Sequence, residues 1–117
     1  MSKRDARLFL RDMLAAITKI ERYTSGLDFA SFEANDMVVD AVVRNLEIIG
    51  EAARHIPEHL RQQYAEVHWQ RVVGFRNIVI HEYFDVDLEI VWVIATKQLP
   101  ALRQALQAML IDLEQSD

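Results

Sequence analysis

A chain of 117 residues is long enough to bury the core of one domain and too short for two. Half of its residues are apolar (51%), it has 3 glycines and 2 prolines, and it has no cysteine, which excludes a disordered protein, a disulfide framework and a thiolate metal site. The net charge of −5 argues against a broad basic surface for nucleic acid.

The N-terminal stretch predicts an amphipathic helix. Ser2 is placed to cap it, apolar residues recur at helical spacing, and Gly26 marks its C-terminal end. The start has no signal-peptide core, and the longest apolar run, residues 90–95, is too short to cross a bilayer. We therefore expect a cytoplasmic protein that does not bind or cross a membrane.

Arginine supplies ten of the thirteen cations. Its planar guanidinium suits bidentate contacts with phosphate, so a local arginine-lined cleft on an acidic body remains possible. The acidic body fits a protein partner equally well. Arg4, Arg7 and Arg11 share one side of the first helix, and we interpret them as a solvated face rather than a nucleic-acid patch.

A second long helix is predicted from Asp36 to about Arg54, after a loop with one helical turn in residues 27–35. Gly50 lies inside this helix, where glycine costs about 1 kcal/mol relative to alanine. We infer that another backbone approaches Gly50 closely. Glu51 falls on the polar side of the same helix, either near a site or as a solvated charge.

Pro57 ends the second helix and starts a short one that stops near Tyr64. His55 and His59 have a spacing that can suit a metal, but no third ligand in a metalloprotease pattern accompanies them. We expect exposed histidines at helix ends, no metal site and no cofactor.

The next helix, predicted over residues 68–82, carries the densest group of reactive side chains. At about 100° per residue, one arc of it is apolar and another is polar. The core arc consists of Val72, Phe75, Ile78 and Val79. The polar arc consists of Arg76, Asn77, His81 and Tyr83.

An apolar stripe of Trp69, Val73 and Ile80 runs through the side of this helix that should face water. Such a stripe favours a partner surface. Contact with a second copy of the chain would place two Arg/His sets side by side. The alternative, that another helix of the same chain covers the stripe, is equally compatible with the pattern.

Asp85 or Asp87 is expected to cap the final helical region, and Pro100 should kink or split it near residues 97–99. No strand alternation, internal repeat or glycine-rich phosphate loop appears. The prediction is an all-α, up-and-down bundle of four main helices plus short helical turns, forming one domain over residues 1–117.

Arginine and histidine together, without a nucleophilic cysteine, support cleavage of RNA by its own 2′-hydroxyl. Imidazole can take or give a proton near neutral pH, and arginine can stabilise the charge that builds on the phosphate oxygens. One imidazole per chain supplies a base or an acid, and two across a dimer supply both. The expected activity is that of a metal-independent endoribonuclease.

The pattern Arg76-Asn77-X3-His81-X-Tyr83 resembles the HEPN superfamily, and within it the HepT-like toxins. The resemblance covers roughly residues 5–113. It extends to Ile48-Ile49-Gly50-Glu51-Ala52, to Trp69 seven residues before Arg76, and to residues 91–100.

This resemblance implies a HEPN-like bundle that acts as the toxin of a type VII-like toxin-antitoxin pair. It implies a homodimer whose cleft is lined by Arg76 and His81, with Asn77 in support. The implied partners are RNA and an MntA-like nucleotidyltransferase antitoxin, which transfers AMP from ATP onto Tyr83. A different class remains open: a non-catalytic nucleotide-binding protein or accessory subunit of a minimal nucleotidyltransferase, which the acidic charge also fits.

Overall fold

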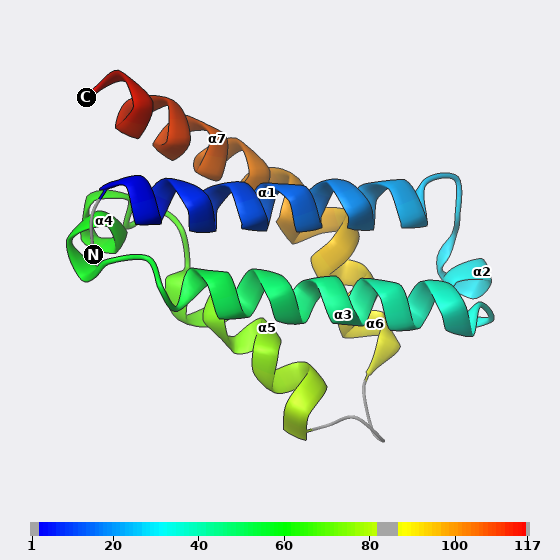
Figure 1. Ribbon diagram of the computed structural model, residues 1–117. Coiled ribbons are helices and arrows are strands. Elements are labelled where there is room, and N and C mark those ends of the chain that lie inside the picture. Colours follow the sequence, from blue (N-terminus) through cyan, green and yellow to red (C-terminus); the bar gives the residue numbers. More distant parts are fainter. Residues whose placement is uncertain (1–2, 82–86, 117) are drawn as a thin grey trace.

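The computed structural model describes the backbone of residues 3–81 and 87–116, and the side chains of residues 6–77 and 87–116. Every element within these ranges is helical (Figure 1), so the all-α prediction is confirmed. The elements are α1 (Lys3–Thr24), α2 (Phe29–Glu33), α3 (Asp36–Ala53), α4 (Glu58–Gln63), α5 (Trp69–His81), α6 (Leu88–Val93), the π-helical segment η1 (Ile94–Gln98) and α7 (Leu99–Gln115).

Helix α3 is the centre of the bundle. It runs antiparallel beside α1, with α2 at the turn between them, and α5 packs against another side of it (Figure 1). Helix α7 packs on α1, while α5 leaves α3 at an angle and points away from the other long helices (Figure 1). The bundle is therefore tight along α1 and α3 and more open around α5.

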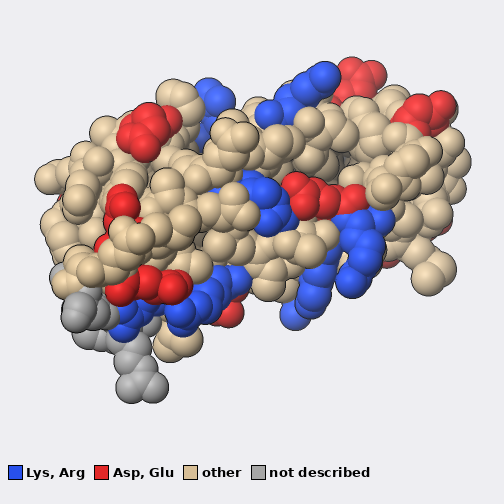
Figure 2. All heavy atoms as spheres, turned by 90° about the horizontal axis from the view of Figure 1, so that it is seen from above, with Lys and Arg blue, Asp and Glu red and all other residues tan. Residues whose placement is uncertain are grey.

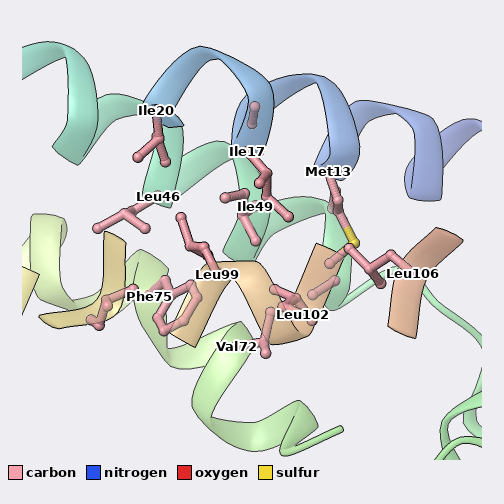
Figure 3. Close-up of a cluster of buried hydrophobic side chains, with 14 of the residues drawn as sticks. Met13, Ile17, Ile20, Leu46, Ile49, Val72, Phe75, Leu99, Leu102 and Leu106 are labelled. Atoms are coloured by element: carbon pink, nitrogen blue, oxygen red, sulfur yellow. The ribbon is translucent and has the colours of Figure 1, made fainter. Parts of the chain in front are cut away.

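The core forms where the apolar faces of α1, α3, α5 and α7 meet (Figure 3). Phe75 and Val72 of α5 are 2% and 5% exposed, which confirms the predicted core arc of this helix for the two residues of it whose side chains are described. The labelled core residues are Met13, Ile17, Ile20, Leu46, Ile49, Val72, Phe75, Leu99, Leu102 and Leu106.

Predicted turn residues mark the helix ends. Gly26 follows α1 with a φ of +78°, a conformation that glycine adopts without steric penalty. Of the two candidate caps for the last helical region, Asp87 is the one within the described residues, and its carboxylate accepts the backbone N–H of Glu89 at 2.9 Å. Such a cap satisfies an N–H group that has no partner inside the helix.

The last helical region splits where Pro100 requires it. Proline has no N–H and its ring crowds the preceding turn, so an α-helix cannot continue regularly through it. The chain inserts the π-helical segment η1 just before, and the Leu99 N–H donates to the carbonyl of Ile94. Pro100 then stands in the first turn of α7, a position that proline tolerates.

The charged side chains of α1 tie it to α7. Arg11 Nη2 lies 3.2 Å from Glu114 Oε1, and Arg103 Nη2 lies 2.6 Å from Glu21 Oε1. Seen from above, charges of both signs are interspersed on the surface (Figure 2). Arg11 therefore serves the packing of α1 on α7, in keeping with the expectation that this side of α1 is not a phosphate-binding patch. No helix in the described part of the chain is long and apolar enough to span a bilayer.

Helices α3 and α5 approach each other closely at Gly50, as inferred from the position of this glycine inside a helix. A Cβ atom placed there would lie 2.7 Å from the backbone N of Arg76 and 3.0 Å from the carbonyl O of Val73. Real side chains do not come so near to backbone atoms. The missing side chain of Gly50 is thus what allows α5 to rest directly on α3.

We predict that Gly50→Ala lowers the free energy of unfolding by about 1–3 kcal/mol, the usual effect of overpacking. The added methyl would overlap two backbone atoms of α5, the N of Arg76 and the O of Val73, so the two helices would have to move apart. Urea unfolding followed by far-UV circular dichroism measures the change.

Gly74→Ala is the matched control, because a Cβ atom at this α5 position has nothing within 4 Å. It should raise the stability by about 0.5–1 kcal/mol through the higher helix propensity of alanine. Equal effects of the two substitutions would contradict the close contact at Gly50.

Candidate functional site

Arg76 lies where α5 crosses α3. Its backbone N and Cβ are among the atoms nearest to Gly50, so the helix contact fixes where its side chain begins. Its Nε lies 3.2 Å from Glu51 Oε2, and the side chain is 39% exposed. The guanidinium is therefore anchored by one nitrogen at the protein surface.

Glu51 draws basic side chains from two helices together. Besides Arg76, Arg54 Nε lies 3.8 Å and His55 Nε2 lies 3.5 Å from its Oε1 atom. Two guanidinium groups and one imidazole thus share the single carboxylate of Glu51. Glu51 contacts Arg76 and its side chain is also 45% exposed, so its role near a site stays a prediction.

A shallow cavity of about 290 Å³ opens between α1 and α3 beside this cluster. The His55 ring forms one wall and stacks on Phe9, with ring centroids 4.8 Å apart and planes 13° from parallel. Arg44 adds a positive charge to the lining, and Asp12 and Glu47 add two negative charges. The sequence did not predict the stacking of His55 on Phe9. It does indicate the contact of His55 with Glu51, because residues four apart lie on one side of a helix.

Asn77 follows Arg76 on α5 and is exposed, as its place on the polar arc predicts. The backbone of α5 continues to His81, but the side chains of Ile80 and His81 lie outside the described residues, and so does Tyr83. The structure thus places Arg76 and Asn77 at the surface. The roles assigned to His81 and Tyr83 stay predictions.

Trp69 is covered by residues of its own chain, which is one of the two alternatives left open for the apolar stripe. Its side chain is 7% exposed, and its indole N–H donates to the carbonyl of Tyr64 at 3.1 Å. Val73 packs partly buried against the core, and its carbonyl faces Gly50. The reason is the close crossing at Gly50, which brings the same chain over this side of α5. A contact between two chains stays a prediction, with Val73 and Ile80 as its remaining apolar residues.

No group of three or more His, Cys, Asp or Glu side chains in the described part of the chain is arranged to hold a metal ion. His55 contacts Glu51 and stacks on Phe9, while His59 is exposed on α4. The described part of the candidate site is centred on Arg76, which contacts Glu51. An arginine bound through Nε keeps its two terminal amino groups available for a bidentate contact with an oxyanion such as phosphate.

We predict that Arg76→Ala changes the free energy of unfolding by less than about 1 kcal/mol, because its ion pair is partly exposed to water. The neighbouring substitution Phe75→Ala should lower it by about 3–5 kcal/mol, because it empties a buried position. Urea unfolding of both variants measures the difference. A loss for Arg76→Ala as large as that for Phe75→Ala would assign Arg76 to the fold instead of the site.

Known proteins resemble this chain over most of its length. The model of the family described as "Ribonuclease HepT-like" matches residues 13–109. A protein of Methanocaldococcus jannaschii named "Putative RNase MJ1380" is 39% identical over 107 residues, which cover 92% of this chain and 98% of that protein. No solved structure matches.

A second relative is the "Probable ribonuclease HepT" of Thermococcus cleftensis. It is 35% identical over 101 residues, which cover 86% of this chain and 92% of that protein. The family match spans most of the chain and includes both Gly50 and Arg76. The chain belongs to the ribonuclease HepT-like family.

Proposed function

We propose that this protein is a metal-independent endoribonuclease whose site is built on Arg76 and His81, with Asn77 in support. The observation that carries the proposal is the guanidinium of Arg76, exposed at the surface and held through Nε by Glu51. Family membership and the names of the relatives as ribonucleases support the same activity.

The reaction uses the 2′-hydroxyl of the RNA as nucleophile. A base removes its proton, the oxygen attacks the adjacent phosphorus, and the bond from phosphorus to the 5′-oxygen breaks. An acid protonates the leaving 5′-oxygen, so the products are a 2′,3′-cyclic phosphate and a 5′-hydroxyl. Arg76 stabilises the extra negative charge on the phosphate oxygens, and the imidazole of His81 transfers protons.

Both proton transfers can occur in one cleft if two chains pair. Each chain then contributes one Arg76 and one His81, and the two imidazoles act as base and acid. Ile80 precedes His81 in α5. A contact through Ile80 would therefore bring the two histidines near the two-fold axis of the dimer. A homodimer is therefore part of the proposal.

The proposal extends to regulation by a partner. As the toxin of a type VII-like toxin-antitoxin pair, the chain would receive AMP from ATP on Tyr83, transferred by an MntA-like nucleotidyltransferase antitoxin. The tyrosine oxygen attacks the α-phosphorus of ATP, and pyrophosphate leaves. The attached nucleotide adds a negative charge and bulk seven residues from Arg76, which would repel the phosphate of RNA.

The net charge of −5 favours a second candidate, an accessory subunit of a nucleotidyltransferase without nuclease activity. The exposed guanidinium of Arg76, held by Glu51, favours the nuclease, because a single arginine can bind one phosphate on an acidic body. Growth arrest on expression of this chain alone, relieved by His81→Ala, is expected only for the toxin.

We predict that Arg76→Ala and His81→Ala each reduce cleavage of total RNA and tRNA in EDTA by at least about 100-fold, the scale of a lost charge-stabilising or proton-transferring group. The measurement is the rate of appearance of fragments with purified protein. Both variants should remain folded by circular dichroism.

Arg71→Ala is the matched control for charge, since Arg71 lies on the same helix and lines a cavity on the α7 side. Its cleavage rate should equal that of the unchanged protein. Full activity in Arg76→Ala, or equal losses in Arg71→Ala and Arg76→Ala, would contradict the proposed site. No cleavage by the unchanged protein, while it is unmodified and dimeric, would favour the accessory subunit.

We predict that co-expression with a neighbouring nucleotidyltransferase adds one or more AMP groups to Tyr83 and stops RNA cleavage. Intact-mass spectrometry and peptide mapping locate the modification, and Tyr83→Phe should stay unmodified and active. Modification of Tyr83→Phe at the same level would place the acceptor elsewhere.

A further inference from the structure

A second and larger cavity, of about 380 Å³, lies between the first half of α5 and the junction of η1 with α7. Its volume is within the range of small-molecule pockets, about 300–1,000 Å³. Arg71, which lines it, precedes Arg76 by five residues, or about 140° around the helix. The cavity therefore lies on a different side of α5 from the cluster at Glu51.

The cavity exists because α5 leans on α3 and diverges from α7 (Figure 1). On the α7 side, the lining includes Ala101 and Ala105, whose methyl groups are too small to fill the space. Its floor is apolar and belongs to the edge of the core, with Val72, Phe75 and Leu102 all at or below 7% exposure. An apolar floor of this kind suits a flat or apolar body.

The rim of the cavity is basic. Arg71 comes from the first turn of α5, His68 immediately precedes this helix, and Lys97 comes from η1 on the opposite side. Glu66 is the single acidic residue of the lining. Among the residues that the structure describes, neither Arg71 nor Lys97 forms an ion pair. Arg71 and Lys97 outnumber the carboxylate of Glu66 in the lining, which favours an anionic ligand.

The wall that contributes Lys97 is itself irregular. Lys97 and Gln98 lie in the π-helical segment, a conformation that is rare and frequently occurs at functional sites. Gln98 also lines the cavity and can both donate and accept hydrogen bonds. The π-helical segment thus places one cation and one amide opposite Arg71.

We propose that this cavity binds a small organic anion with a flat apolar body. The rings lie on Val72, Phe75 and Leu102, and the anionic group lies between Arg71 and Lys97. Because the ligand joins α5 to α7 across the open side of the bundle, its binding stabilises the folded protein. This site is independent of RNA cleavage at Arg76.

Naphthalene-1-sulfonate is a suitable probe, with 1-naphthalenemethanol as the uncharged probe of the same ring system. Backbone amide shifts in two-dimensional NMR should show saturable binding of the anion, with the largest shifts around Val72 and Leu102. Arg71→Gln and Lys97→Gln should each weaken binding about tenfold, the effect of one lost charge-assisted hydrogen bond. The uncharged probe should bind the unchanged protein about tenfold or more weakly for the same reason.

Lys19→Gln is the matched control, since Lys19 is an exposed cation on α1 outside the cavity. It should bind the anion as the unchanged protein does, while Ala101→Trp should block binding by filling the cavity. The absence of saturable binding would overturn the proposal. So would equal dissociation constants for Lys19→Gln, Arg71→Gln and Lys97→Gln. Because these experiments measure ligand binding, their result does not depend on the result of the RNA cleavage assays.

Discussion

The contact of two backbones at Gly50 is the constraint on which the rest of this structure depends. A side chain at Gly50 would meet the backbone of Arg76 at 2.7 Å, so only glycine allows α5 to rest on α3 at this distance. The same crossing covers Trp69, directs Phe75 into the core and leaves Arg76 beside Glu51. The close packing of α5 on α3 therefore also fixes the position of Arg76 in the candidate site.

Electrostatics explain how an acidic protein can present a phosphate-binding group. The net charge of −5 is a property of the whole chain, whereas the field near a bound phosphate is set by groups within about one Debye length, roughly 8–10 Å in cellular salt. Around Glu51 those groups include the cations Arg54 and Arg76 and the carboxylate of Glu47, so the contact with phosphate depends on the Arg76 guanidinium itself. Glu51 holds Arg76 through Nε, which orients the guanidinium before any substrate arrives and reduces the entropy lost on binding.

Local sequence signals predicted the features that depend on local physics. The helix pattern, the turn at Gly26, the cap at Asp87 and the break before Pro100 all follow from backbone chemistry within a few residues. Gly50 was informative because its penalty inside a helix requires a compensating contact. The periodicity of α5 identified Phe75 as core and Arg76 as surface.

Features that depend on how the helices cross could not be predicted from the sequence. The partner of Trp69 was left undecided between a second chain and the same chain, because periodicity shows that a face is apolar without showing what covers it. The stacking of Phe9 on His55 joins α1 to the end of α3, and the basic cavity between α5 and η1 joins segments far apart in the chain.

The most direct test of the proposed chemistry is to identify the ends of RNA fragments made by the purified protein in EDTA. The account predicts 2′,3′-cyclic phosphates and 5′-hydroxyls, whereas 5′-phosphates and 3′-hydroxyls would contradict it, because water would then be the nucleophile.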